Sequence, residues 1–178
     1  MYILQFDGML HQLTGRMEKA GLLGYGWLIT NNDNEVGRGF GVFAHKHMAS
    51  SNIAEYLALI EGLEALTDLR IWKEPIAIRG DAKCVIDQMK GVVSISSIPT
   101  RRLRDRARWL ANHFDILTWT WVPRNHNKPA DKLSRRGLRQ LHAIPNAYEN
   151  VLTQLKNQRI SGGGLISVMD LRVYTPLN

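Results

Sequence analysis

Cysteine is almost absent from this sequence, which has a single one, Cys84, among 178 residues. One cysteine cannot close an internal disulfide, and it offers no second thiolate for a zinc site or a redox pair. Free cysteines are often buried, so we expect Cys84 to be a small buried thiol in an intracellular protein. The sequence is therefore not that of a disulfide-stabilised secreted domain.

Long apolar runs are also lacking. No stretch approaches the length that spans a bilayer, and the first ten residues carry Asp7 within their apolar stretch and have no basic leader. We expect no signal peptide, no membrane association and a cytoplasmic location.

Acidic residues are the minority charge, with 16 Asp and Glu against 23 Lys and Arg, which gives a formal net charge of +7. The hydrophobic content of 44% is ordinary for a globular chain, so disorder is excluded and the length predicts one domain. A basic surface favours a polyanionic partner, and we expect that partner to be nucleic acid.

The periodicity of the chain predicts an α/β fold. Alternating or short apolar runs predict five strands, and apolar residues at three- and four-residue spacing predict helices. Three strands come first, and the last two alternate with helices. This order predicts a five-stranded mixed sheet, three antiparallel strands followed by two parallel ones, flanked by helices. The predicted strands cover 2–10, 21–30, 36–44, 75–79 and 116–122, and the helices begin after 50–52, after Asp81, near Thr100 and near Pro129. The run Asn31-Asn32-Asp33-Asn34 predicts a hairpin turn, and Trp119 and Trp121 are expected to form one face of a core strand.

The end of the chain departs from this pattern. We divide the sequence into a domain over 1–143 and a C-terminal extension over 144–178, which is too short for a core of its own. Residues 146–158 are expected to form a helix, and 165–174 are strand-like. The extension would cover an open edge of the sheet, because an unpaired edge strand is a liability, or would form the interface of a homodimer.

Four carboxylates stand at predicted element ends from which they could converge. Asp7 lies in the first strand, Glu55 in a first helical turn, Asp81 at a strand end and Asp131 in another first turn. Carboxylate oxygens are the ligands that hard divalent cations prefer, and two such ions can hold the attacking water and the leaving oxygen of a phosphodiester. The sequence therefore indicates a metal-dependent phosphodiester site.

Structural roles compete with this interpretation. Asn52 and Glu55 have the spacing of a capping box, and Asp131 suits the positive end of a helix dipole. Gly80-Asp81 could be a simple turn. Asp7 is harder to explain in this way, because a carboxylate in a central strand needs a partner.

Several segments resemble type 1 ribonuclease H. They are Phe6-Asp7-Gly8, the run Asn52-Ile53-Ala54-Glu55-Tyr56-Leu57-Ala58-Leu59, Gly80-Asp81-Ala82-Lys83, Trp121-Val122-Pro123-Arg124 and Asn127-Lys128-Pro129-Ala130-Asp131. The resemblance covers about residues 1–143 and implies the ribonuclease H-like fold.

The resemblance implies endonucleolytic cleavage of the RNA strand of RNA–DNA hybrids. It also implies that Asp7, Glu55, Asp81 and Asp131 hold two Mg²⁺ ions, with Mn²⁺ as a possible substitute, and that the products carry 5′-phosphate and 3′-hydroxyl ends. Hybrids are read in this family through 2′-hydroxyls and strand shape. By position, the residues expected to contact the substrate are Gly8, Ser51, Asn52 and Asn127.

The sequence departs from the family in three places. The residue after the third acid, often Ser, is Ala82. The loop before the last acid is short, and His126 is either the family's proton-transfer histidine or an exposed loop residue. A separate basic protrusion is absent, and an arginine-rich helix could replace it by contacting phosphates, or could be a solvated face. That helix carries Arg101, Arg102, Arg104, Arg106 and Arg108.

Two other functions stay open. One is a non-catalytic nucleic-acid binding module, although a binding surface would gain from losing acids that lie next to phosphates. The other is a nuclease of the same fold with a different substrate. Proofreading exonucleases of the superfamily place Asp-x-Glu on the first strand, and the residue here is Met9, which disfavours that activity.

Overall fold

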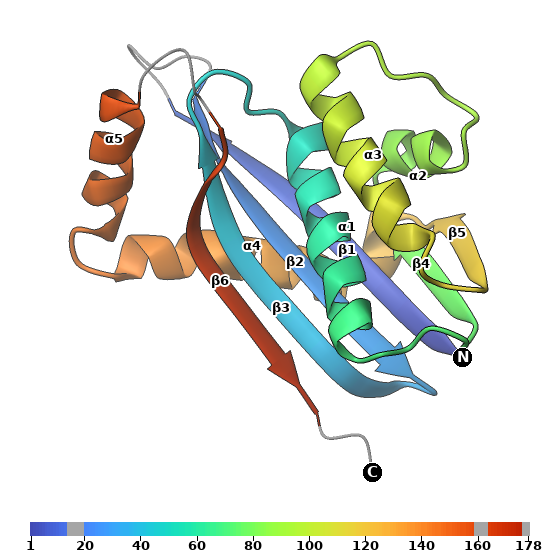
Figure 1. The fold of residues 1–178 in the computed structure, drawn as a ribbon. Helices are drawn as coiled ribbons and strands as arrows, with labels where there is room; N and C mark the ends of the chain where they lie inside the picture. The colour runs from blue at the N-terminus through green and yellow to red at the C-terminus, as the bar shows by residue number, and fades with distance from the viewer. Residues whose placement is uncertain (14–19, 159–163, 176–178) are drawn as a thin grey trace.

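The computed structural model describes residues 1–13, 20–158 and 164–175. They form one six-stranded mixed sheet with the strand order β5-β4-β1-β2-β3-β6 (Figure 1). The strands β1, β2 and β3 are antiparallel neighbours, β4 and β5 are parallel, and β6 is antiparallel to β3. The strands are β1 (Tyr2–Gln12), β2 (Gly21–Asn31), β3 (Asn34–His45), β4 (Ile76–Gly80), β5 (Leu117–Trp121) and β6 (Ile166–Tyr174).

The α/β class and the order of the first five strands are confirmed, and the strand count is corrected from five to six. The sixth strand comes from the C-terminal extension, which continues the sheet along β3 from Ala44 opposite Ile166 to Gly37 opposite Tyr174. The extension therefore covers the edge that β3 would otherwise expose.

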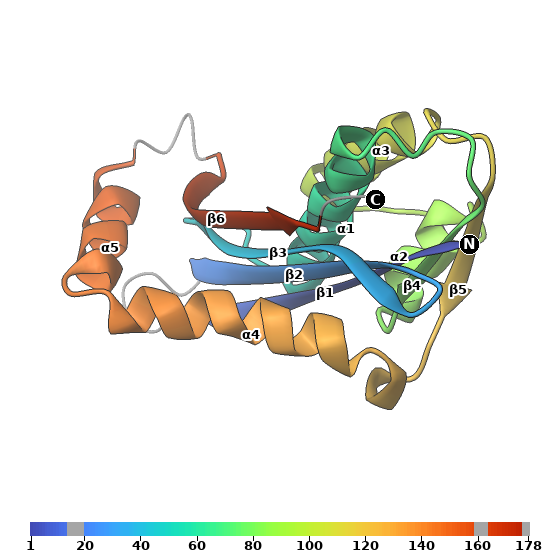
Figure 2. The same ribbon diagram turned by 90° about the horizontal axis from the view of Figure 1, so that it is seen from below.

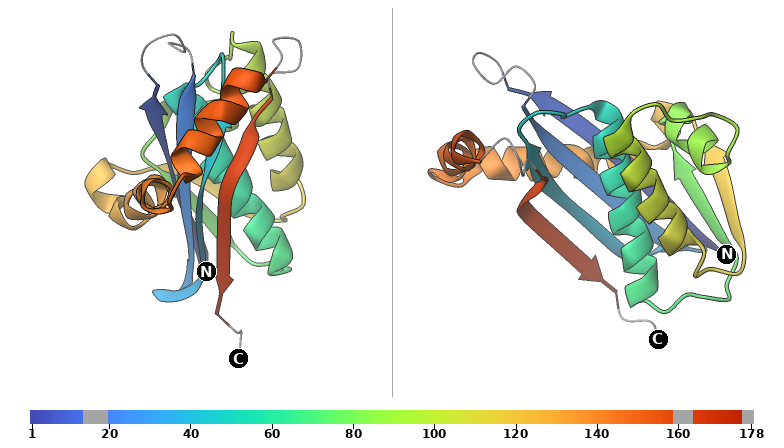
Figure 3. Two further views of the ribbon diagram at one scale, coloured as in Figure 1. Left: turned by 90° about the vertical axis from the view of Figure 1, so that its left-hand side faces the viewer. Right: turned by 45° about the horizontal axis from the view of Figure 1, so that its top comes forward.

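Helices cover the two faces of the sheet. In Figure 2, α1 and α3 lie on one side of the sheet and α4 lies on the other, while α5 stands at the end of the sheet near β6. Figure 3 shows the packing of α1 against α3. The helices are α1 (Ser51–Asp68), α2 (Lys83–Met89), α3 (Ile98–Ala111), α4 (Lys128–Ala143) and α5 (Ala147–Asn157), with a short 3-10 helix η1 (Arg124–His126) before α4.

The main core lies between the sheet and α1. Phe6, Tyr25, Trp27 and Tyr56 are fully buried there. α1 is apolar nearly all round, since it packs on the sheet with one side and on α3 with another. This packing holds the helix over β1, which matters because the helix carries Glu55.

The turn between β2 and β3 follows the sequence prediction. Asn32 and Asp33 both have positive φ, 49° and 65°, as the two central residues of a tight hairpin turn of the favoured twist require. Asn and Asp tolerate this backbone region better than most residues, which explains why the asparagine-rich run marks the turn.

Two expectations about burial are wrong. Cys84 is exposed at the start of α2, where its sulfur accepts a hydrogen bond from Gln88 Nε2 at 3.1 Å. Trp121 is 44% exposed, because β5 is an edge strand and not a core strand. Trp119, two residues earlier in β5, is partly buried and packs against the main core.

The sixth strand is tied to α1 by a group of ion pairs. Arg172 of β6 contacts Glu61 at 2.7 Å, Glu64 at 3.2 Å and Asp68 at 3.2 Å. Glu61 is only 8% exposed, and its burial raises the pKa of its carboxyl to about 7. The extension and α1 are therefore joined by side chains as well as through the sheet.

Within the described residues, no helix combines the length and the hydrophobicity needed to cross a membrane.

Candidate active site

Asp7 lies in β1, just beyond the point where the pairing of β1 with β4 ends. The parallel pairing of β1 with β4 ends at Gln5 opposite Arg79, so Asp7 lies two residues beyond the last pair. Its side chain is on the face covered by α4, where it accepts a short hydrogen bond from the Ser134 hydroxyl. Only 5% of Asp7 is exposed, which makes it a buried carboxylate in a central strand.

Glu55 lies in the first turns of α1. The helix is capped by Ser50, whose hydroxyl accepts a hydrogen bond from the Ile53 amide at 3.3 Å. The competing interpretation of Asn52 and Glu55 as a capping box is therefore wrong, and the Glu55 carboxylate accepts a hydrogen bond from the Gly8 amide at 3.1 Å.

Gly8 lets the helix come this close. A Cβ at position 8 would overlap the backbone of Ala54 and Glu55, so any other residue would push α1 away from β1. The glycine after Asp7 is thus a packing requirement of the site.

Asp81 follows β4 directly and is held by Asn127. The Asn127 side-chain amide donates to Asp81 Oδ1 at 2.8 Å and to the Phe6 carbonyl at 2.8 Å. The Trp121 indole N–H donates to the Asp81 carbonyl at 3.0 Å. The end of β4, the end of β5 and the residue before α4 are therefore tied together at this acid.

Three of the four predicted acids converge. Asp7, Glu55 and Asp81 each offer a carboxylate oxygen, and these oxygens all lie within 4.8 Å of one another. Carboxylates this close repel one another unless a cation or a proton compensates them. Three oxygen donors of this kind fit a hard divalent cation such as Mg²⁺.

Asp131, the fourth predicted acid, is engaged by two arginines. Arg124 contacts its Oδ1 at 2.6 Å, and Arg135 contacts it at 2.9 Å and 3.2 Å. Its charge still acts on the cluster, because it is one of the causes that raise the pKa of Asp7. Asp131 therefore adjoins the three acids without joining their closest group.

The electrostatics divide the acids into two kinds. Burial, together with the charges of Asp81 and Asp131, raises the pKa of Asp7 to about 6, although the hydrogen bond from Ser134 lowers it. Burial also raises the pKa of Glu55 well above its usual value. The hydrogen bond from Arg135, with that from Arg124, holds the pKa of Asp131 below its usual value. Buried carboxylates with raised pKa values are typical of functional sites.

The predicted substrate residues fall into two groups. Gly8, Ser51 and Asn52 lie at the site, since Ser51 and Asn52 precede Glu55 by about one helical turn and remain at least partly exposed. Asn127 is fully buried, and its side chain donates to Asp81. A substrate contact through Asn127 stays a prediction.

His126 lies in the exposed helix η1 just before Asn127. Its carbonyl accepts a hydrogen bond from Gln5 Nε2 at 2.9 Å, whereas its ring forms no hydrogen bond in the described part of the chain. A catalytic role for His126 stays a prediction.

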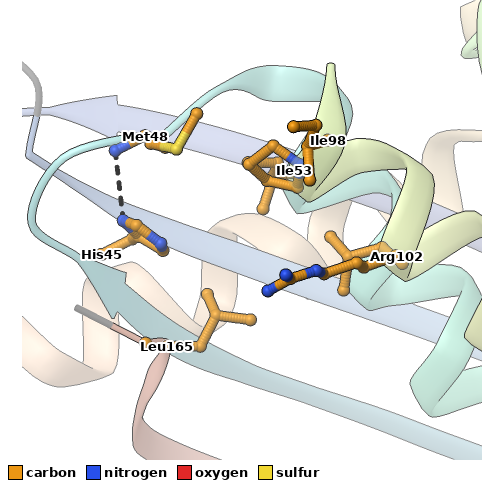
Figure 4. A pocket seen from close by; sticks show the side chains of 9 residues that line it. His45, Met48, Ile53, Ile98, Arg102 and Leu165 are labelled. Atoms are coloured by element: carbon orange, nitrogen blue, oxygen red, sulfur yellow. Dashed lines mark hydrogen bonds between the residues drawn. The ribbon is translucent and has the colours of Figure 1, made fainter. Parts of the chain in front are cut away.

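The arginines of α3 are mostly engaged by the protein. Arg101 donates to the Ile95 carbonyl at 3.0 Å, and Arg106 pairs with Glu64 at 3.1 Å. Arg102 lines a pocket of about 490 Å³ between the end of β3, α1 and α3. Figure 4 shows the Arg102 side chain reaching into this pocket opposite His45, with Leu165 from the extension below. Arg102 therefore lines a pocket, whereas Arg101 and Arg106 bond to other groups of the protein.

Sequence reasoning missed three contributors: Ser134, Arg124 and Arg135. Ser134 and Arg135 lie three and four residues after Asp131, which places them on the same helix surface as this acid. That spacing was a usable signal for both residues. Arg124 had no such signal, because its contact with Asp131 depends on the path of the loop.

The chain matches the family model described as reverse transcriptase-like over residues 6–137. It belongs to this family, whose domain is ribonuclease H-like. The match begins one residue before Asp7 and ends after Asp131, so it spans all four acids. The resemblance to type 1 ribonuclease H is confirmed by a curated relative and by a solved structure of this type.

Ribonuclease HI of Halobacterium salinarum is 36% identical over 113 residues, which are 64% of this chain and 55% of that protein. The chain therefore spans about half the length of this curated relative. A crystal structure of ribonuclease H1 from the same organism superposes with a TM-score of 0.66 at 34% identity, over 78% of this chain and 98% of that one.

A third relative shows the fold alone. The crystal structure of LC11 ribonuclease H1 in complex with an RNA/DNA hybrid has a TM-score of 0.66 at 22% identity, over 79% of this chain and 98% of that one. The chain therefore has the fold of type 1 ribonuclease H, and this fold positions the acids.

Proposed function

We propose that this chain is an endoribonuclease that cleaves the RNA strand of RNA–DNA hybrids by metal-assisted hydrolysis and leaves 5′-phosphate and 3′-hydroxyl ends. One observation carries the proposal. Asp7, Glu55 and Asp81 come from three elements far apart in the sequence, yet their oxygens lie within 4.8 Å of one another. A family of ribonuclease H-like domains supports the same reading.

The acids would hold two Mg²⁺ ions, or Mn²⁺ in their place, with Asp131 as the fourth ligand. Bound ions of this kind lower the pKa of a coordinated water and stabilise a leaving oxygen. The chain itself contributes orientation. The Gly8 amide fixes Glu55, the Ser134 hydroxyl fixes Asp7, and the Asn127 amide fixes Asp81, so the ligands need little rearrangement when they bind cations.

Several features support a hybrid as the substrate. Ser51 and Asn52 offer polar side chains about one turn from Glu55, suited to 2′-hydroxyl contacts, and the half-exposed indole of Trp121 lies beside Asp81. Arg101 and Arg102 of α3 would contact phosphates. LC11 ribonuclease H1, which shares this fold, has been crystallised with an RNA/DNA hybrid.

The C-terminal extension, residues 144–178, is proposed as a stabilising part of the catalytic domain over 1–143. The pairing of β6 with β3 and the contacts of Arg172 with α1 support this. A homodimer through the extension stays the alternative, and sedimentation of the chain truncated after residue 158 separates the two. Truncation that lowers the melting temperature without changing the mass per particle supports the packing role. The cytoplasmic location stays a prediction.

A panel of end-labelled substrates tests the function. The hybrid, the matching RNA duplex, the DNA duplex and the single strands are each incubated with Mg²⁺, with Mn²⁺ and with a chelator. We expect metal-dependent cutting confined to the RNA strand of the hybrid. Cutting of another substrate would point to a nuclease of different specificity, and hybrid binding with no cutting would point to a non-catalytic module.

A further inference from the structure

A groove with a cationic rim lies between β1 and α4. Its volume is about 370 Å³. An apolar floor is formed by Met9 and Leu138, and the rim is formed by nitrogen-bearing side chains, which are His11, Arg135, Arg139 and His142. Among the residues that the structure describes, no carboxylate lines the groove. This combination suits a ligand that is anionic on one side and weakly polar on the other.

The groove continues from the acids. Asp7, Met9 and His11 are alternate residues of β1, so their side chains share the face that α4 covers. Arg135 lies between the acids and the groove, because its guanidinium contacts Asp131 and its side chain also lines the groove. A polymer held at the acids and running along β1 would therefore enter the groove.

The rim groups are available to a ligand. Arg139 is exposed and forms neither a hydrogen bond nor an ion pair in the part of the chain that the structure describes. The rings of His11 and His142 lie edge to face at 6.0 Å, and His142 lies 4.6 Å from the Tyr148 ring. These ring contacts leave imidazole N–H groups free to donate.

The spacing along α4 suits successive anions. Arg135 and Arg139 are four residues apart, which places them side by side on the helix surface, about 5–6 Å between Cβ atoms. Guanidinium groups bind phosphate oxygens through paired hydrogen bonds, and apolar side chains can pack against the sugar between two phosphates.

We propose that this groove binds the sugar-phosphate backbone of the strand that is cut, directly beside the scissile position, with Arg139 as its principal phosphate contact and His11 and His142 as supporting donors. The identity of the strand rests on the proposed function. The groove adjoins the acids that would hold the scissile phosphate, so the RNA strand of a hybrid is the strand that reaches it.

Binding of a labelled hybrid at several salt concentrations, with a chelator present to prevent cutting, tests the site. We expect Arg139→Gln to weaken binding about fivefold and to reduce the slope of log K against log salt by roughly 0.7–0.9, the value for one lost phosphate contact. The double variant of His11→Asn with His142→Asn should weaken binding less.

Arg136→Gln is the matched control. It removes the same charge from the next residue of α4, where the guanidinium lies 4.8 Å from the Phe40 ring and not in the groove. The control should keep the wild-type slope. Slopes that are equal for wild type, Arg139→Gln and Arg136→Gln would overturn the proposal.

Neutral methylphosphonates placed singly along each strand identify the strand. Binding of these hybrids to wild type and to Arg139→Gln forms a double-mutant cycle. We expect non-additive losses at one RNA-strand position beside the ribonucleotide cut by the wild type. Coupling to the DNA strand alone would overturn the proposal. Absence of cleavage by the wild type would defeat the proposed function, whereas the binding cycle would still report on the groove.

Discussion

The side-chain amide of Asn127 donates a hydrogen bond of 2.8 Å to Asp81. The same nitrogen reaches the carbonyl of Phe6, the residue before Asp7, at 2.8 Å. One fully buried side chain therefore holds two of the three converging acids in register, one directly and one through the backbone of β1.

Replacement of Asn127 should impair both folding and catalysis. Asn127→Ala leaves the Phe6 carbonyl without its partner, which costs about 1–3 kcal/mol of unfolding free energy. It also frees Asp81 to turn, and loss of a supporting contact of this kind lowers metal-dependent activity by about 10–100-fold. Urea denaturation and the rate of hybrid cleavage measure the two effects. Asn125→Ala, at an exposed position in η1, is the control and should change neither.

Asp7 should make the metal-free protein less stable as the pH rises. Its pKa is about 6 in the folded protein and near 3.8 when unfolded, so the native state binds the proton more tightly. The unfolding free energy therefore falls between about pH 4 and pH 6 and stays low above this range, by a total of about 3 kcal/mol from this group. Asp7→Asn removes this contribution.

Denaturant titrations in chelator from pH 4 to pH 7.5 test this, with wild type compared with Asp7→Asn. The comparison cancels most of the contribution of Glu61, whose pKa is also raised. We expect the variant to be more stable above pH 6 and the difference to shrink towards pH 4. A difference that does not vary with pH would contradict the assignment of a raised pKa to Asp7.

Arg124 should compete with divalent cations for Asp131. Its guanidinium lies 2.6 Å from the Asp131 carboxylate and lowers the pKa values of Asp7 and Glu55 through space. Because the arginine side chain is 67% exposed, the pair is worth about 0.5–1 kcal/mol. We expect Arg124→Gln to bind Mn²⁺ about two- to fivefold more tightly in calorimetric titration. Unchanged or weaker Mn²⁺ binding would show that Arg124 does not compete with the metal.

Arg172 should be the residue that secures the sixth strand. Removal of its guanidinium in Arg172→Met leaves the buried Glu61 carboxylate unpaired, and we expect a loss of about 2–4 kcal/mol in unfolding free energy. Arg38→Gln is the comparison, because the Arg38–Glu35 pair is solvent-exposed and contributes less than about 1 kcal/mol. Similar losses for both variants would mean that the group around Arg172 is not a buried contact.

The order of the elements and the identity of the acids could be read from the sequence because both are local signals. Alternating residues predict strands, Asn32 and Asp33 predict the tight turn, and the segments around Asp7 and Glu55 carry the family resemblance. Contacts between segments that are far apart in the sequence could not be predicted from local signals. The contact of Arg124 with Asp131 depends on the path of the loop, and the burial of Asn127 depends on how β1, β4 and α4 meet.

The misjudged residues show the same limit. Trp121 alternates with threonines as a core-strand residue does, but β5 is an edge strand of the sheet that the described residues form, and the side chain is exposed. Cys84 is apolar enough for a core, yet it occupies the outward face of a short helix. Periodicity identifies an element, whereas its depth in the molecule is set by the elements packed around it.

Cleavage by Asp81→Asn tests the central claim most directly. The substitution keeps the size of the side chain and removes one charge from the three converging carboxylates. We predict that the wild type cuts the RNA strand of a labelled hybrid in Mg²⁺, and that the variant binds the same hybrid with similar affinity but does not cut it. A variant that cuts at the wild-type rate would contradict the account, because the acids would then not be the site of the reaction.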